Sequence, residues 1–308
     1  MKFILAPDSF KESMSAKKAC LAMEKGIKTV FPNAECVAVP MADGGEGIVE
    51  SLVSQSNGEI IHIEVIGPLG EAVTAQYGLI SEGQTAVIEM VAASGLELIK
   101  PADRDPLLAT TFGTGQLIKD ALDRGARRFL IGIGGSATND GGAGMLQALG
   151  VSFKDKDGEE LPFGGGALGH LHTIDTSRMD ERLKLVQIDV ACDVTNPLIG
   201  GNGASAVFGP QKGATPEMVC LLDCNLAHYA EMIQRQLGKD IAGFDGAGAA
   251  GGLGAGLLAF MNADLKRGID LVIEYTGIEN VMKDADYVFT GEGSIDGQPL
   301  FGKTPYGV

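Results

Sequence analysis

Five short polar clusters each follow a predicted strand of this chain. They are Asp8–Lys11, Asp43–Gly47, Ser136–Gly142, Asp193–Asn196 and Gly291–Asp296, and the cations available to them are Lys11, Arg104, Lys212 and Lys303. Carboxylates suit Mg²⁺, glycine amides and cations suit phosphate oxygens, and a carboxylate can orient an attacking hydroxyl group. Any single cluster has a simpler explanation in an Asp or Ser that caps a helix. Five together favour one shared site, with an inventory typical of phosphoryl transfer.

The most informative stretch is the glycine-rich turn at 132–144, G-I-G-G-S-A-T-N-D-G-G-A-G. It lies between a predicted buried strand at 128–131 and a predicted helix at 145–149. Such a turn brings backbone N–H groups and a helix N-terminus close to an anion. We therefore predict a phosphate or nucleotide site made by a set of small residues, namely Gly134, Gly135, Ser136, Thr138 and Asn139. Asp140 and Glu292 are the candidate Mg²⁺ ligands.

The same turn also leaves a second function open. Residues 132–137 fit the dinucleotide fingerprint G-x-G-x-x-[GA], and Asp155 and Asp157 lie near the expected acidic position. The alternative is therefore an NAD-dependent dehydrogenase. The composition of 154–158 is that of a polar turn, not of a strand end that could hold a ribose, and this disfavours the alternative.

A P-loop pattern, G-x-x-x-x-G-K-[ST], occurs at residues 297–304. Pro299 removes one amide from the supposed phosphate cradle, and several loop residues separate the pattern from the preceding predicted strand. We do not expect a true P-loop here. Lys303 stays a candidate phosphate contact as a point charge.

Apolar runs and their spacing predict an α/β fold. Strands are expected at 2–6, 35–39, 58–66, 72–80, 84–91, 128–131, 185–191 and 286–290, and helices at 15–29, after Gly47, at 106–122 and at 249–261. Alternating strands and helices at the start predict a parallel sheet, while 58–91 has the pattern of antiparallel hairpins and indicates a change of domain near residue 60. In open α/β sheets, ligands bind beyond the carboxyl ends of the strands, where the polar clusters lie.

Composition excludes some partners. The formal charge is 24 − 40 = −16, which argues against a general nucleic-acid binder. The five cysteines are irregularly spaced, the first residues lack the pattern of a signal peptide, and no apolar run is long enough to span a membrane. We expect a cytoplasmic protein with reduced thiols that binds no membrane.

Seven motifs in order give the chain a resemblance to bacterial glycerate kinase, family 1. They are the motif at 6–11 (A-P-D-S-F-K), that at 40–47 (P-M-A-D-G-G-E-G), that at 109–115 (A-T-T-F-G-T-G), the turn at 132–144, N-P-L at 196–198 with V-F-G-P-Q-K-G at 207–213, the glycine-rich run at 246–256, and T-G-E-G at 290–293 with Asp296, Gln298, Gly302 and Lys303. The resemblance covers the whole chain. Two positions depart from the family pattern: Glu12 stands where Gly is expected, and Pro299 where Ser or Thr is usual.

The resemblance implies a fold and an activity. The expected fold is a Rossmann-like parallel-sheet domain, residues 1–60 and 265–308, with an inserted mixed α/β domain of the swivelling type, residues 61–264. A further segment is expected beyond residue 308, so that the C-terminus is truncated. The implied reaction is ATP-dependent phosphorylation of D-glycerate, with Mg²⁺, to 2-phosphoglycerate. A homodimer and a non-catalytic fragment that binds nucleotide or hydroxy acid stay open.

Roles within this reaction can be assigned as hypotheses. Asp193 is the first candidate for the base that orients the 2-hydroxyl, because it ends a predicted strand beside Asn196, and Asp43 and Asp296 are its rivals. Lys11 is counted with these catalytic groups as a cation that steadies phosphate, and Lys303 shares that task. The expected substrate-binding residues are Asp8, Ser9, Arg104 and Asn196, with Arg104 on the glycerate carboxylate.

Overall fold

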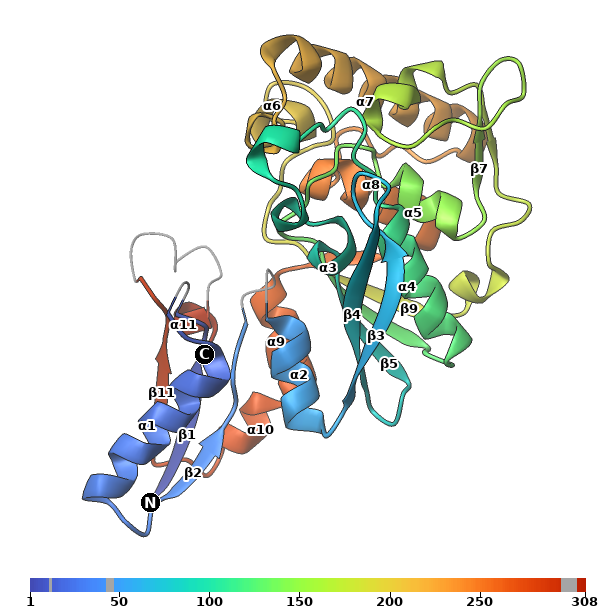
Figure 1. Cartoon of the computed structure of the whole chain (residues 1–308). Coiled ribbons are helices and arrows are strands. Elements are labelled where there is room, and N and C mark those ends of the chain that lie inside the picture. The colour runs from blue at the N-terminus through green and yellow to red at the C-terminus, as the bar shows by residue number, and fades with distance from the viewer. Residues whose placement is uncertain (11–12, 43–46, 295–303) are drawn as a thin grey trace.

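The computed structural model of the chain describes residues 1–10, 13–42, 47–294 and 304–308 and shows an α/β fold with two main sheets (Figure 1). The smaller sheet has three parallel strands in the order β11-β1-β2. Their bounds are Lys2–Pro7 for β1, Glu35–Ala38 for β2 and Tyr287–Gly291 for β11. Helix α1, Ala16–Val30, connects β1 to β2 and is capped by Ser15, whose side chain accepts from the Lys18 N–H.

The larger sheet has six strands in the order β10-β9-β6-β5-β4-β3. Their bounds are Glu59–Ile66 (β3), Ala72–Ile80 (β4), Thr85–Glu89 (β5), Arg128–Gly132 (β6), Gln187–Ala191 (β9) and Asp264–Lys266 (β10). The first three strands pair antiparallel and the rest parallel. The hairpin pattern predicted for 58–91 is therefore confirmed, and β6 is apolar throughout its centre because helices cover both of its faces.

Helices and short elements complete the fold. The helices are α2 (Ile48–Ser56), α3 (Val91–Ser94), α4 (Phe112–Asp123), α5 (Ala143–Ala148), α6 (Ala204–Phe208), α7 (Pro216–Leu237), α8 (Ala249–Met261), α9 (Gly268–Thr276), α10 (Ile278–Met282) and α11 (Thr304–Gly307). Strands β7 (Ser152–Lys154) and β8 (Thr173–Asp175) form a separate hairpin. Short 3-10 helices occur at Leu96–Leu98, Pro101–Asp103, Gly165–His170, Glu181–Lys184 and Pro210–Lys212.

Helices α2 and α9 lie between the two sheets (Figure 1). They share one apolar core with both, which joins Ile4 of β1, Val87 of β5 and Ile269 of α9. The opposite face of the six-stranded sheet is covered by a second core that includes Phe129 and Tyr229. Because α2 and α9 bury side chains against both sheets, the sheets are held in a fixed relation around these helices.

Two predicted helices differ in detail. The helix expected from residue 106 begins at Phe112, because the Thr110 N–H bonds the carbonyl of Pro68 and the preceding residues form a turn closed by Asp105. Helix α8 has the expected bounds, but its first turn is kinked by left-handed backbone at Ala250, Gly251 and Gly252.

The strand ends of the six-stranded sheet form one edge. Glu89 pairs with Gly132, Gly132 with Ala191, and Ala191 with Lys266, so the carboxyl ends of four parallel strands lie in a row. The first turn of α2 meets this row, since the Val49 N–H donates to Glu89 Oε1 at 3.3 Å. This edge positions the candidate site.

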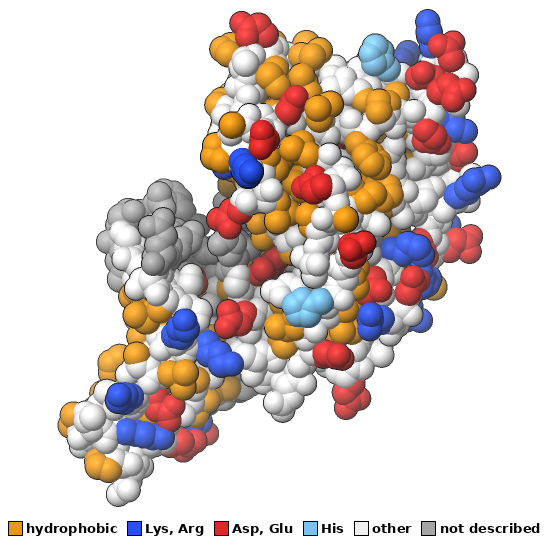
Figure 2. Space-filling model, in the orientation of Figure 1, with side chains coloured by type: hydrophobic (Ala, Val, Ile, Leu, Met, Phe, Trp, Pro, Cys, Tyr) orange, Lys and Arg blue, Asp and Glu red, His pale blue; other side chains and the backbone are white. Residues whose placement is uncertain are grey.

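The described part of the chain contains no helix that is both long and apolar enough to cross a membrane. On the face shown in Figure 2, Lys and Arg side chains are interspersed with Asp and Glu. That face therefore offers no broad basic patch of the kind that nucleic acids require.

Candidate active site

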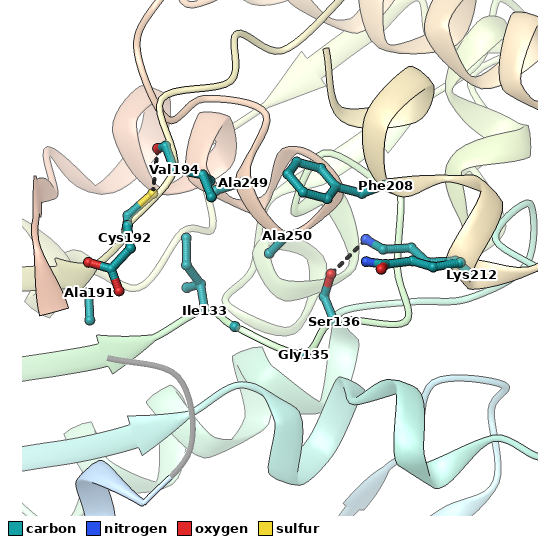
Figure 3. A pocket seen from close by; sticks show the side chains of 13 residues that line it. Ile133, Gly135, Ser136, Ala191, Cys192, Val194, Phe208, Lys212, Ala249 and Ala250 are labelled. Atoms are coloured by element: carbon teal, nitrogen blue, oxygen red, sulfur yellow. Dashed lines mark hydrogen bonds between the residues drawn. The ribbon is translucent and has the colours of Figure 1, made fainter. Parts of the chain in front are cut away.

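A cavity of about 200 Å³ opens at the carboxyl edge of the six-stranded sheet (Figure 3). It is built by the loops that follow β6 and β9, the end of α6, the turn at 210–212 and the start of α8. Its walls are mostly apolar, and its lining residues are Ile133, Gly134, Gly135, Ser136, Ala191, Cys192, Asp193, Val194, Phe208, Gln211, Lys212, Ala249 and Ala250. The structure therefore brings together four predicted site residues, Gly134, Gly135, Ser136 and Asp193, around one cavity.

The loop after β6 is held from several sides. The Leu96 N–H donates to the Gly135 carbonyl at 2.9 Å, and the Ala137 N–H donates to the Ser94 carbonyl at 3.0 Å. The Asn139 side-chain amide donates to Ser205 Oγ of α6 at 3.0 Å. These bonds fix the shape of the loop in advance of any ligand.

Asp140 is fully buried and organises the end of this loop. Its Oδ2 accepts from the backbone N–H and hydroxyl of Thr111, both at 2.8 Å, and from the Gly144 N–H at 3.2 Å, while Oδ1 accepts from the Gly142 N–H at 3.1 Å. Burial raises the pKa of this carboxyl group, and the donated hydrogen bonds act to lower it. The observed contacts of Asp140 thus hold the start of α5; its predicted Mg²⁺ role stays a prediction.

Glycines of α8 allow the loop and this helix to touch. Gly251 has a φ of +68°, and a Cβ built on it would lie 1.9 Å from the carbonyl oxygen of Thr138. The Gly141 N–H donates to the Gly251 carbonyl at 3.0 Å. Thr138 and Asn139 are buried behind the cavity, so they support the loop from within instead of lining the cavity.

Lys212 is the least expected residue of the site, because its ammonium group is buried. Its Nζ donates to Ser136 Oγ at 2.6 Å (Figure 3). It also donates to the Thr138 carbonyl at 2.6 Å. Burial lowers the pKa of Lys212 to about 7, and the nearby Asp140 charge acts in the opposite direction. Lys212 is one of the cations that the sequence offers but has no predicted role, since a lysine in a Pro-Gln-Lys-Gly turn is normally exposed.

Asp193 lines the cavity two residues after the end of β9. Its Oδ1 accepts from the Gly268 N–H at 2.8 Å, at the first turn of α9. Asp193 therefore provides a hydrogen-bond acceptor at the N-terminal end of α9. The neighbouring Cys192 lines the cavity, and burial raises the pKa of its thiol, which keeps it in the neutral form.

Two predicted substrate contacts lie beside the cavity without lining it. The Asn196 side-chain amide donates to the Asn202 carbonyl at 2.8 Å, within its own loop. Arg104 Nη1 donates to the carbonyl of Gln211, a lining residue, at 3.1 Å. Arg104 is therefore one residue away from the cavity wall.

A second group of predicted residues lies at the carboxyl end of the three-stranded sheet. Asp8 and Ser9 line a small hollow of about 40 Å³ together with residues of α2, including Glu50 and Ser51. Asp8 is buried, and the Thr304 hydroxyl donates to its Oδ2 at 2.7 Å. Since α2 also meets Glu89, both groups border the N-terminal turn of one helix.

The remaining predicted residues belong to neither of these two groups. Glu292 is half-buried and follows β11. Four candidates, Lys11, Asp43, Asp296 and Lys303, lie outside the described residues. Among the residues that are described, no cluster of three or more His, Cys, Asp or Glu side chains could hold a metal ion by itself.

Glu89 escaped the sequence analysis. It ends β5 in register with Gly132, and its carboxylate caps α2 through the Val49 N–H. Glu89 lies inside the strand expected at 84–91, so it is not among the charged residues that follow a predicted strand. Its neighbours Ile88 and Met90 are apolar and no glycine is adjacent, so the local sequence gives no sign of a polar turn.

Residues 3–308 match the model of the glycerate kinase family. The chain belongs to this family. It is 58% identical over 308 residues to a glycerate kinase of Bacillus subtilis and 55% identical over 308 residues to a glycerate 2-kinase of Escherichia coli K12. Each alignment covers 100% of this chain and 81% of the relative.

A solved crystal structure has the same fold. The crystal structure assigned to a glycerate kinase 2 of Salmonella typhimurium LT2 superposes with a TM-score of 0.96 at 54% identity. It matches 100% of this chain, which spans 82% of that protein. The resemblance expected from the seven motifs is confirmed.

Proposed function

We propose that this chain is a glycerate kinase that transfers the γ-phosphoryl group of Mg²⁺-ATP to the 2-hydroxyl of D-glycerate. The family and the name of the Escherichia coli relative support the reaction class. The structural observation that carries the proposal is the cavity at the strand ends, where the glycine-rich loop faces Asp193. A preorganised loop of amides beside a carboxylate suits a reaction whose catalysis is mostly positioning and charge stabilisation.

Each residue has a proposed task in this reaction. Asp193 accepts the proton of the 2-hydroxyl at its carboxylate as the phosphoryl group arrives. The Gly268 N–H fixes that carboxylate in place. Ser136 and the amides of Gly134 and Gly135 cradle phosphate oxygens, and the apolar walls exclude water.

Magnesium enters as part of the nucleotide substrate. Mg²⁺ bound to phosphates needs only one or two protein carboxylates, so the lack of a three-residue cluster among described positions does not conflict with it. We propose Glu292 for this contact. We propose Arg104 for the glycerate carboxylate, because it reaches the cavity wall through the Gln211 carbonyl.

The domain division is likewise a proposal. All three strands of the smaller sheet fall within 1–60 and 265–308, whereas strands of the larger sheet run from residue 59 to residue 266. This membership supports a Rossmann-like part and an inserted part, with α2 and α9 between them. A cytoplasmic location and a homodimer belong to the same set of proposals.

Two measurements on the purified chain test the proposed reaction. Calorimetric titration with ATP and D-glycerate reports binding, and a coupled assay of ADP release reports turnover. Binding together with glycerate-dependent ADP release is expected. Binding without ADP release would instead support the non-catalytic alternative. The dehydrogenase alternative predicts NADH binding by fluorescence, but Asp155 and Asp157 lie in or beside the turn after β7, away from the parallel sheet.

A further inference from the structure

The buried ammonium of Lys212 has no task in the reaction outlined above. It lies on the turn at 210–212, it is 2% exposed, and it borders the cavity. Its two partners belong to a segment more than 70 residues earlier in the chain, on the loop that follows β6. Burying an ammonium group is costly unless its hydrogen bonds are satisfied, and the two bonds to this loop offset part of that cost.

We propose that Lys212 is a positioning residue, which holds the glycine-rich loop in its reactive shape through Ser136 and the Thr138 carbonyl. This inference rests on the proposed kinase function. One ammonium group bridges the hydroxyl of Ser136 and the carbonyl two residues later, so it fixes both the side-chain direction of Ser136 and the bend of the loop. In this shape the loop directs the Ser136 hydroxyl proton and the adjoining backbone amides toward phosphate oxygens.

The surroundings of Lys212 show why a cation is used at this place. The opposite side of the loop is already clamped by α8, through the close approach of Gly251 to Thr138, and by the buried Asp140. On the side of the turn at 210–212, Lys212 supplies the two hydrogen bonds to Ser136 and to the Thr138 carbonyl. Neighbouring charges are Asp140 behind the loop, Asp193 across the cavity and Arg104, which packs against Gly213.

Protonation of Lys212 adds a testable consequence. Burial keeps the pKa of this amine near neutrality, at about 7, and Asp140 acts to raise it. Above that pH the amine loses its charge, and its hydrogen bonds to the loop become weaker. Turnover is therefore expected to fall severalfold between pH 7 and pH 9 in the wild type.

Hydrogen exchange of peptides covering 133–142 tests the positioning role without any need for turnover. The variant is Lys212→Met, which keeps an apolar side chain of similar length, and the control is Lys283→Met at an exposed lysine far along the chain. Exchange at least 10-fold faster in Lys212→Met, with wild-type exchange in the control, is expected. Unchanged exchange in Lys212→Met would overturn the inference. Should this variant fail to fold, Ser136→Ala removes one of the two partners and must loosen the same peptides.

Kinetics then separate positioning from direct contact with substrate. A loss of about 100-fold in kcat is expected for Lys212→Met, a smaller loss for Ser136→Ala, and no further loss in the double variant. Additive losses would mean that Lys212 binds substrate itself, which refutes the proposal. The proposal is supported if turnover of Lys212→Met no longer falls between pH 7 and pH 9. It is contradicted if turnover of this variant falls as it does in the wild type. If the wild type releases no ADP while exchange still responds, the proposed reaction fails and the positioning role stands.

Discussion

Gly251 gives the sharpest test of how the loop is held. Its φ of +68° and the predicted Cβ contact of 1.9 Å to the Thr138 carbonyl leave no room for a side chain. In Gly251→Ala, the new Cβ needs an ordinary contact distance of about 3.4 Å from the Thr138 carbonyl oxygen. The two backbones must therefore move apart by about 1.5 Å. The left-handed conformation itself adds about 1–2 kcal/mol for any residue with a Cβ.

A matched control isolates the close approach from the backbone conformation. Gly238 ends α7 with a φ of +72°, and a Cβ on it meets no described atom within 4 Å. Gly238→Ala should therefore lose only the conformational 1–2 kcal/mol and keep its activity. Gly251→Ala should lose more stability and about 100-fold in kcat, since a displacement of 1 Å at a reacting site costs about that much.

Urea unfolding measures the loss of stability of each variant, and the ADP-release assay measures its loss of kcat. If Gly251→Ala loses no more stability than Gly238→Ala and keeps full activity, the claim that α8 sets the position of the loop is refuted. A loss of activity in Gly238→Ala would equally show that the assay responds to general destabilisation.

Three further predictions concern the charged residues. Because the folded state holds Lys212 at a pKa of about 7, well below its ordinary value, it binds fewer protons than the unfolded chain above pH 7. The free energy of unfolding of the wild type, measured in urea, should rise relative to Lys212→Met by up to about 1.4 kcal/mol per pH unit between pH 7 and 9; a constant difference would contradict the burial of a titrating amine. Asp193→Asn keeps an acceptor for the Gly268 N–H, so its melting temperature should stay close to that of the wild type while kcat falls at least 100-fold; near-normal turnover would remove Asp193 as the base. Arg104→Ala should raise the KM for glycerate far more than the KM for ATP, and equal effects would rule out its carboxylate role.

Local pattern predicted most of the strands and several helices. The apolar run at 128–131 and the glycines after it gave β6 and its loop, because both depend on neighbouring residues alone. The start of α4 was wrong, since it is set by the bond between Thr110 and Pro68, which lie 42 residues apart. No local periodicity contains that information.

The candidate site was predictable only in part for the same reason. Residues in the loops that follow strands, such as Ser136 and Asp193, could be selected because parallel strands end at one edge. The burial of Lys212 depends on Ser136, 76 residues away, and the capping of α9 by Asp193 spans 75 residues. Such pairings arise from tertiary packing, so the sequence predicted the chemistry of these side chains but not their partners.

A phosphorus NMR spectrum of the chain with Mg²⁺-ATP and D-glycerate tests the central claim most directly. The account predicts loss of the ATP γ-phosphate signal and one new phosphomonoester signal that coincides with added 2-phosphoglycerate. The same spectrum recorded with Asp193→Asn should show little of that signal over the same time. A signal that coincides with 3-phosphoglycerate, or no new ester at all, would contradict phosphoryl transfer to the 2-hydroxyl at this cavity.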